Sequence, residues 1–137
     1  MVDLANVKAG DVLPSFTTDP LTRTTLALYC GASGDHNPIH VDIDFAKRAG
    51  YPDVFAHGML SMAWLARLLT NWVPQAHLRE YGVRFTAITQ VGEAITCSGT
   101  VTEVFEADGE RRARLSLQTA NAAGQVKLQG DAVVALD

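Results

Sequence analysis

The sequence predicts an α+β domain in which an antiparallel sheet curls around one long apolar helix. The hydrophobic period changes once, near residue 75, from helical spacing to strict alternation. Before that point, the stretch GMLSMAWLARLLTNWVP (residues 58–74) is apolar on nearly every side, which is typical of a helix buried all round. The alternating segments that follow are the strands that we expect to enclose this helix.

Two shorter helices are predicted ahead of the long one. The first lies within residues 21–34, where Thr22 can cap its start and Gly34 can end it. The second lies within residues 42–50, with Asp42 or Asp44 in the capping turn and Gly50 as the C-terminal stop.

The second half of the chain is predicted to form antiparallel strands. From residue 78 onward, alternating runs are separated by the turn-forming stretches VGEA, ADGE and NAAGQ, which favour tight connections between neighbours. In the last run, alternate positions from Val126 to Leu136 share one face, while Lys127, Gln129 and Asp131 share the other. We therefore expect one buried and one largely exposed face.

Length, composition and charge limit the classes of protein. A chain of 137 residues with 47% hydrophobic content fits one domain, spanning residues 1–137. A net charge of −4 argues against a nucleic-acid partner, because phosphates favour a strongly basic surface.

The N-terminal sequence, the lack of a long apolar stretch and the cysteines predict a cytoplasmic protein. The N-terminus has neither the basic start nor the apolar run of a signal peptide, and no stretch is long enough for a membrane span. Cys30 and Cys97 lack a C-x-x-C pattern, which fits reduced thiols better than a disulfide framework or a zinc ribbon.

A polar cluster at residues 35–40, DHNPIH, is the candidate functional site. His36 and His40 have the spacing of two metal ligands on a helix, but Pro38 between them disfavours a helix and biases Asn37 towards an extended conformation. We therefore interpret the segment as a loop and predict no metal. A carboxylate and an imidazole on a rigid loop, Asp35 and His40, are a plausible general acid/base pair.

A purely structural interpretation of the cluster is also possible. Asp35 could cap a turn, and His40 could be a hydrogen-bonded residue at the edge of the core. Against this, Ile39 and Val41 alternate around His40, so that they would anchor the loop to the core while His40 points the other way.

The stretch YCGASGDHNPIHVDIDFAKRAGYPDVFAHGML resembles the signature of the MaoC-like, (R)-specific enoyl-thioester hydratase and 3-hydroxyacyl-thioester dehydratase family. The likeness lies in the G-D-x-N-P-x-H core and the downstream A-H-G-M-L, and it extends more weakly from KAGDVLP to YGVRFTAITQVGEAI. This resemblance implies a single hot-dog fold, a long central helix wrapped by an antiparallel sheet. The hydrophobic period predicts the same architecture independently.

The resemblance also implies the reaction and its residues. Asp35 and His40 would be the catalytic dyad, presented by a loop that Asn37 and Pro38 shape. The implied reaction is the reversible addition of water to a trans-2-enoyl thioester, giving an (R)-3-hydroxyacyl thioester. The substrate would be carried on coenzyme A or on an acyl carrier protein, and no cofactor is implied.

The motif HGML places a glycine at the start of the apolar helix. The backbone N–H of Gly58 would lie at the positive end of the helix dipole, where it could stabilise the negative charge on the thioester oxygen as a catalytic oxyanion donor. Asn37, His57 and Met59 are the candidate substrate-binding residues, although His57 could also be only a helix-entry residue.

Two alternatives to a self-sufficient hydratase stay open. A hot-dog thioesterase would hydrolyse the thioester, but such enzymes often carry a carboxylate on the central helix, and residues 58–74 contain no Asp or Glu. The chain could also be a dehydratase subunit that works only in a heterodimer. Family resemblance implies a homodimer or heterodimer with sheets joined edge to edge.

Overall fold

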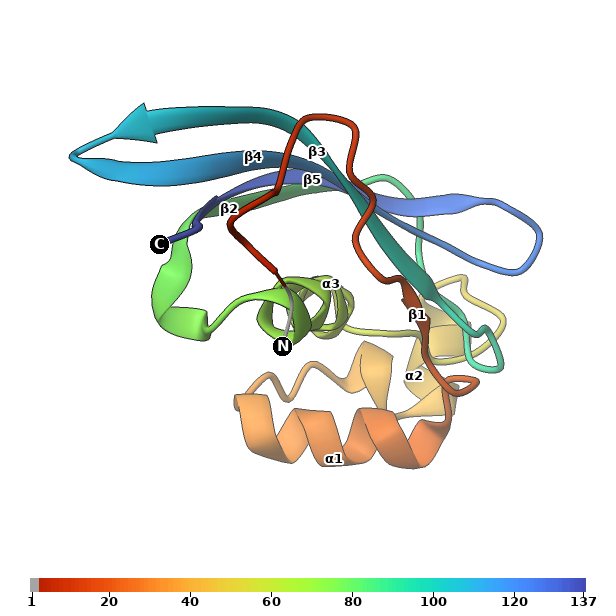
Figure 1. Cartoon of the computed structure of the whole chain (residues 1–137). Helices are drawn as coiled ribbons and strands as arrows, with labels where there is room; N and C mark the ends of the chain where they lie inside the picture. Colours follow the sequence, from red (N-terminus) through yellow and green to blue (C-terminus); the bar gives the residue numbers. More distant parts are fainter. Residues whose placement is uncertain (1–2) are drawn as a thin grey trace.

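Five antiparallel strands form one curved sheet in the order β1-β3-β4-β5-β2 in the computed structural model, which describes residues 3–137. The strands are β1 (Phe16–Thr17), β2 (Leu78–Phe85), β3 (Thr96–Ala107), β4 (Glu110–Ala120) and β5 (Val126–Ala135). The helices are α1 (Arg23–Ser33), α2 (Ile43–Arg48) and α3 (Gly58–Trp72), with short 3-10 helices η1 (Pro38–His40) and η2 (Gln75–His77). The long helix α3 lies between the sheet and α1 (Figure 1), as the sequence predicts.

The predicted helix boundaries are confirmed by their caps. The hydroxyl of Thr22 accepts a hydrogen bond from the Thr25 amide, and α1 ends at Gly34 in the left-handed conformation with φ of 75°. Asp42, rather than Asp44, caps α2 by accepting from two backbone amides. Gly50 follows α2 with φ of 95°, a conformation that favours glycine.

The predicted alternation is confirmed in β4, whereas in β5 Val133 and Ala135 are buried on the face that Gln129 and Asp131 share. Ala113, Leu115 and Leu117 of β4 are buried against the helix side. Lys127 of β5, predicted on the exposed face, is instead only 3% exposed. Lys127 is buried because the connection between β2 and β3, which is distant in the sequence, folds over this end of β5 and places its backbone against the Lys127 side chain.

The same connection differs from the prediction that neighbouring strands follow one another along the chain. The turn stretches at 107–110 and 121–125 do join adjacent strands. The stretch VGEA does not, because β2 pairs with β5 at one edge of the sheet while β3 lies on the other side of β4. Residues 86–95 therefore cross from one side of the sheet to the other. We call residues 86–93 the crossing loop.

Helix α3 is buried on one face only, so the prediction that it is buried all round is wrong for this chain. Its buried residues are Leu60, Ser61, Leu65, Leu68, Leu69 and Trp72. Arg67 and Met59 are exposed on the other side. The far side of α3 stays exposed because α1 and α2 are too short to cover it. They pack against the first turns of α3 only, in a cluster that includes Leu26, Ala46 and Leu60.

Two further observations bear on the class of protein. No helix in the described part of the chain, residues 3–137, has the length and apolar character needed to cross a membrane. Cys30 and Cys97 are free, as predicted.

Candidate active site

The cluster at residues 35–40 is held by short-range hydrogen bonds from its own side chains. Asp35 Oδ1 accepts from the Asn37 amide at 3.2 Å, and Asn37 Oδ1 accepts from the Ile39 amide at 3.1 Å. Asn37 has an extended ψ of 120°, as the following proline requires, and Pro38 begins η1 where no amide hydrogen is needed. The polar side chains thus build the turn that presents them.

Residues 35–37 belong to no helix or strand, as predicted for a loop, but Pro38–His40 form a single turn of 3-10 helix that we did not predict. In this turn Val41 is 44% exposed and His40 is 9% exposed, so the predicted alternation around His40 is wrong. Ile39 does pack against the α1 and α2 cluster. The difference arises because Pro38 favours helical φ at the start of a turn, which rotates consecutive side chains by about a third of a turn instead of half a turn.

The hydrogen bond of the His40 ring fixes its tautomer. His40 Nδ1 lies 2.8 Å from the carbonyl oxygen of Phe55. A carbonyl oxygen only accepts, so Nδ1 carries the hydrogen and Nε2 of the neutral ring is the unprotonated nitrogen. The fold therefore prepares His40 as a base.

His57 lies directly against His40. The two rings stack with centroids 3.9 Å apart and an interplanar angle of 26°. His57 Nε2 donates to the backbone oxygen of Asp35 at 3.3 Å, and the edge of the ring meets Tyr29 at a centroid distance of 4.8 Å. A side chain from the start of α3 thus contacts both His40 and the backbone of Asp35.

His57 is held in its neutral form. Its side chain is nearly fully buried, and its Nδ1 has no hydrogen-bond partner in the described structure. Burial is the main cause that lowers the pKa of His57, the proximity of His40 adds to it, and the contacts with Asp35 oppose it only in part. A proton taken up by His40 therefore meets no charged imidazole beside it.

The depressed pKa of His57 predicts a loss of stability in acid. The unfolded chain binds a proton at His57 below its ordinary pKa of 6.5 while the folded chain resists it, so the free energy of unfolding falls as the pH drops through this value. His57→Gln can still donate to Asp35 and should flatten the decline between about pH 7 and pH 5. Chemical denaturation at several pH values measures this, with exposed His36→Gln as the control. An equally steep decline in His57→Gln would contradict it.

Three potential metal ligands meet at this point. A carboxylate oxygen of Asp35 and ring nitrogens of His40 and His57 all lie within 4.8 Å of one another. Stacked imidazoles hold their lone pairs in nearly parallel planes, which do not intersect within the roughly 2.1 Å length of a metal–nitrogen bond. The arrangement suits a base and its support better than a metal ion. That no metal is used stays a prediction.

A cavity of about 330 Å³ opens beside His40. This volume lies in the range of small-molecule sites. Its walls are mostly apolar, and they come from the start of α3, the end of β2 and the crossing loop. The lining residues are His40, Phe55, Ala56, Gly58, Ser61, Phe85, Thr86, Ala87, Ile88, Thr89 and Leu128.

Gly58 brings the N-terminus of α3 to this cavity. A Cβ added at Gly58 would lie 3.0 Å from the ring of Phe85, so the absence of a side chain keeps the space beside the first helical amide open. The first amides of a helix have no acceptor within the helix and face the positive end of its dipole. The cavity therefore combines a base, His40, with amide donors suited to a developing negative charge.

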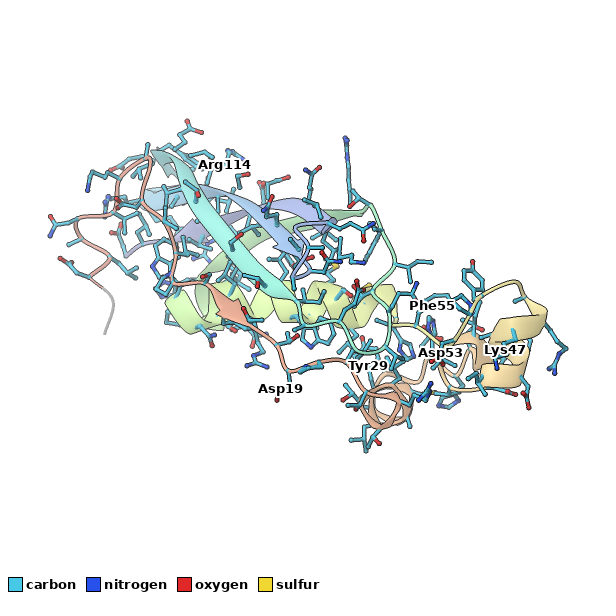
Figure 2. All side chains as sticks on the ribbon, turned by 90° about the vertical axis from the view of Figure 1, so that its right-hand side faces the viewer. Asp19, Tyr29, Lys47, Asp53, Phe55 and Arg114 are labelled. Carbon is cyan, nitrogen blue, oxygen red and sulfur yellow. The ribbon has the colours of Figure 1, made fainter. Side chains whose placement is uncertain are left out.

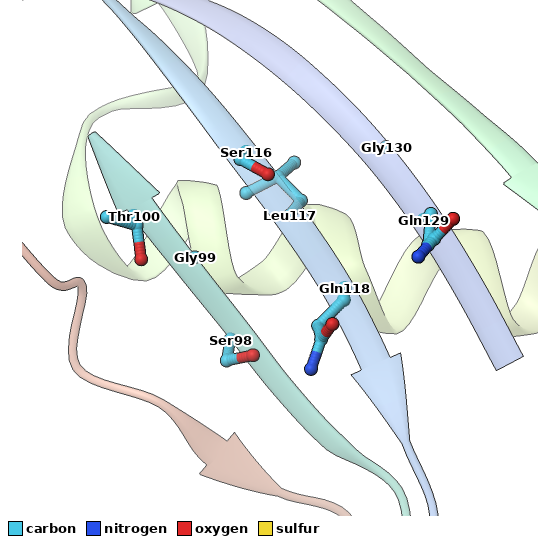
Figure 3. Close-up of a pocket in the computed structure, with 8 residues that line it drawn as sticks. All are labelled: Ser98, Gly99, Thr100, Ser116, Leu117, Gln118, Gln129 and Gly130. Atoms are coloured by element: carbon cyan, nitrogen blue, oxygen red, sulfur yellow. The ribbon is translucent and has the colours of Figure 1, made fainter. Parts of the chain in front are cut away.

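A larger hollow of about 470 Å³ lies elsewhere, on the face of the sheet away from α3 (Figure 3). Its polar lining is made of hydroxyl and amide groups from β3, β4 and β5, among them Ser98, Ser116 and Gln118. No acid, base or cation lines it, so it offers no acid–base chemistry. The smaller cavity at His40 is the candidate active site.

The remaining candidate residues fall around the site in different ways. Asp35 is exposed and does not line the cavity, although its carboxylate is close to the two imidazoles. Asn37 uses its side-chain oxygen within the turn. Met59 is 57% exposed and lies outside the lining. Whether Asn37, His57 or Met59 contacts substrate stays a prediction.

Sequence reasoning missed Ser61 and the crossing loop as parts of the site. Ser61 is 6% exposed and lines the cavity. It follows Gly58 by three positions on a helix, so the shared face was readable from the spacing. The wall formed by Thr86, Ala87 and Ile88 has no local signal, because sheet pairing brings it there.

Figure 2 shows that Arg114 lies away from the end of the molecule that carries the candidate active site. Tyr29, Asp53 and Phe55 lie together near α1 and α2, while Arg114 lies at the opposite end of the sheet. Arg114 is paired there with Glu103, with 3.4 Å between their charged atoms. Its position argues against a contact with a substrate in this cavity.

Comparison with known proteins places the chain in a family. The sequence model of the MaoC like domain matches residues 7–122. An (R)-specific enoyl-CoA hydratase from Rhodospirillum rubrum is 29% identical over 116 residues, which cover 83% of this chain and 78% of the relative. The chain belongs to the MaoC-like family.

Solved structures confirm the hot-dog fold. The unliganded R-hydratase PhaJ1 from Pseudomonas aeruginosa superposes with a TM-score of 0.84 at 26% identity, covering 97% of this chain and 84% of that one. The ChsH1-ChsH2 complex from Mycobacterium tuberculosis gives a TM-score of 0.82 at 21% identity, covering 96% of this chain and 99% of that one, and this likeness concerns the fold alone.

Proposed function

We propose that this protein is a hydro-lyase that adds water to trans-2-enoyl thioesters, giving (R)-3-hydroxyacyl thioesters, and catalyses the reverse dehydration. The observation that carries the proposal is the His40 tautomer: its Nδ1–H is bound to the Phe55 carbonyl, so the base nitrogen is free in a ring that lines an apolar cavity. The hydratase from Rhodospirillum rubrum, to which the chain is similar, supports this reaction class.

Asp35 and His40 act on one water molecule. As the water oxygen bonds to the β-carbon, the dyad removes a proton from it, and the electrons of the carbon–carbon double bond move towards the thioester carbonyl. The dyad then returns a proton to the α-carbon, so that the elements of one water are added. Neutral His57 stacks on His40 and favours its transient protonation, because no second positive charge lies beside it.

The thioester oxygen is held by the N-terminus of α3. The amide of Gly58 donates to this oxygen as negative charge develops on it, assisted by the helix dipole. The acyl chain occupies the apolar cavity between Phe85 and Ile88. Coenzyme A or an acyl carrier protein carries the substrate.

The fate of a thioester separates this function from the alternative, a hot-dog thioesterase. Incubation with crotonyl-CoA should remove the enone absorbance without releasing free thiol, and chiral analysis of the product should give the (R)-3-hydroxy isomer. Release of thiol without hydration would support the thioesterase instead. The described α3 carries no carboxylate, which favours hydration.

We further propose that the protein works as a homodimer or heterodimer in the cytoplasm. The edge strand β2 ends at Phe85, which is 56% exposed beside the cavity, and Met59 is similarly exposed. A second subunit at this edge would cover both side chains. Free Cys30 and Cys97 fit a reducing compartment. Light scattering of the purified protein determines the number of subunits.

A further inference from the structure

A buried lysine lies behind the wall of the acyl cavity. Lys127 on β5 is 3% exposed, and its ammonium group has all three hydrogens satisfied. Lys127 Nζ donates to the Ile88 carbonyl at 2.7 Å and to Gln125 Oε1 at 3.0 Å, and it lies 3.0 Å from Glu93 Oε2. Lysine is rarely fully buried, and a buried ammonium group needs partners, so these three contacts hold the Lys127 side chain in one place.

Glu93 ties the ammonium group to the rest of the crossing loop. Its Oε2 accepts from the Gln90 amide at 2.7 Å, and its Oε1 accepts from the Asn121 side chain at 2.8 Å. Burial by itself would raise the pKa of Glu93, but the hydrogen bonds of Asn121 and Gln90 and the contact with Lys127 outweigh burial and lower it. The carboxylate is therefore ionised and paired.

The crossing loop held in this way is one wall of the cavity. Thr86, Ala87, Ile88 and Thr89 are consecutive lining residues and belong to no helix or strand. The loop receives support at its two ends, where the Thr86 amide donates to the Lys127 carbonyl and the Thr89 carbonyl accepts from Ala56. Between these two ends of the loop, the Lys127 ammonium group donates a hydrogen bond to the Ile88 carbonyl.

The crossing loop is also connected to His40, the candidate base, through residues 55 and 56. The Ala56 amide that binds Thr89 follows Phe55, whose carbonyl holds His40 Nδ1. Phe55 also forms a β-bridge with Gln90, the residue whose amide Glu93 holds. The ion pair is thus connected, contact by contact, both to the acyl wall and to the support of His40.

We propose that Lys127 and Glu93 form a positioning pair that fixes the crossing loop as the wall of the acyl cavity and thereby sets the selectivity for acyl chain length. The proposal rests on the proposed hydratase function. The pair touches neither substrate nor reacting atoms. It acts through the Ile88 carbonyl and the Gln90 amide, which it holds in place.

The test uses the double variant Lys127→Met/Glu93→Gln in the full chain. Replacing both charges avoids leaving one of them buried without its partner, which is the costly case. Lys127→Met alone is compared with it. The matched control is Lys8→Met/Asp11→Asn, which removes an ion pair at 3.2 Å that does not belong to the cavity lining.

The readout is the kcat/KM for crotonyl, octenoyl and dodecenoyl thioesters on one carrier. In the wild type, the ratio between the best and the poorest substrate defines the selectivity. We expect this ratio to shrink by about tenfold in the double variant, the size that one methylene of misfit gives in an apolar pocket, and to stay unchanged in the control. Amide exchange at residues 87–90, followed by mass spectrometry, should become faster.

The outcomes separate the two proposals. A wild-type protein that hydrates none of the thioesters would refute the proposed function, and the exchange measurement would still test the tether. An active double variant with unchanged selectivity and unchanged exchange would overturn the positioning role. Loss of thermal stability with unchanged selectivity would also overturn it, since a merely structural pair gives that result.

Discussion

His40→Gln should lower kcat for enoyl-thioester hydration by about 10²–10⁴-fold, the usual contribution of a positioned general base. The reason is the tautomer, because the Phe55 carbonyl leaves Nε2 of His40 as the basic nitrogen, and an amide side chain has no comparable base. Asp35→Asn should give a loss of similar size. Its amide oxygen can still accept from the Asn37 amide, so the turn is retained. Steady-state hydration of crotonyl-CoA measures both losses.

The double variant distinguishes a dyad from two independent residues. If Asp35 and His40 act on the same water, Asp35→Asn/His40→Gln should be scarcely slower than either single variant, because residues that work as a unit are strongly non-additive. His36→Gln is the control, since His36 is exposed within the same turn. Near wild-type turnover in His40→Gln, with an unchanged fold by circular dichroism, would remove His40 from the mechanism.

The parts of the fold that could be predicted are those written in neighbouring residues. Thr22 and Asp42 cap their helices through hydrogen bonds that span two or three positions, and Gly34 ends α1 because the left-handed conformation favours glycine. Alternation within β4 depends only on strand geometry. These features need no knowledge of distant segments.

The predictions that were wrong share a different physical cause, because they depend on packing by segments that are distant in the sequence. The burial of Lys127 depends on the crossing loop, which comes from residues far away in the sequence. The exposed face of α3 depends on how much surface two short helices can cover. Neither quantity is encoded in the period of the segment itself, so the exposed position of Lys127 and the fully buried α3 were both predicted wrongly.

The candidate site shows the same division. The motif brings Asp35 and His40 together within one turn, and the sequence predicts this pair. The stacking of His57 on His40 joins two segments that approach only in the folded chain. The cavity wall requires β2 to pair with β5, an order that alternation does not reveal. The candidate catalytic groups were therefore predictable, whereas the groups that support them were not.

Gly58→Ala should lower kcat/KM for enoyl thioesters by about 10²-fold, close to the effect of losing one oxyanion donor. The new methyl group would lie 3.0 Å from Cε1 and 3.2 Å from Cδ1 of Phe85, within the cavity that both residues line. It would occupy space beside the first amide of α3, where the thioester oxygen is expected. The fold should not be weakened, since alanine favours a helix more than glycine does.

Two companion variants decide what the methyl group obstructs. Gly31→Ala adds the same methyl to α1, where it would meet nothing within 4 Å, and should leave kcat/KM unchanged. If the methyl only displaces the half-exposed ring of Phe85, then Gly58→Ala/Phe85→Ala should recover activity relative to Phe85→Ala alone. If it blocks access to the amide, the loss should persist in that background. Undiminished hydration by Gly58→Ala would contradict the proposal that the thioester oxygen uses the space kept open beside this amide.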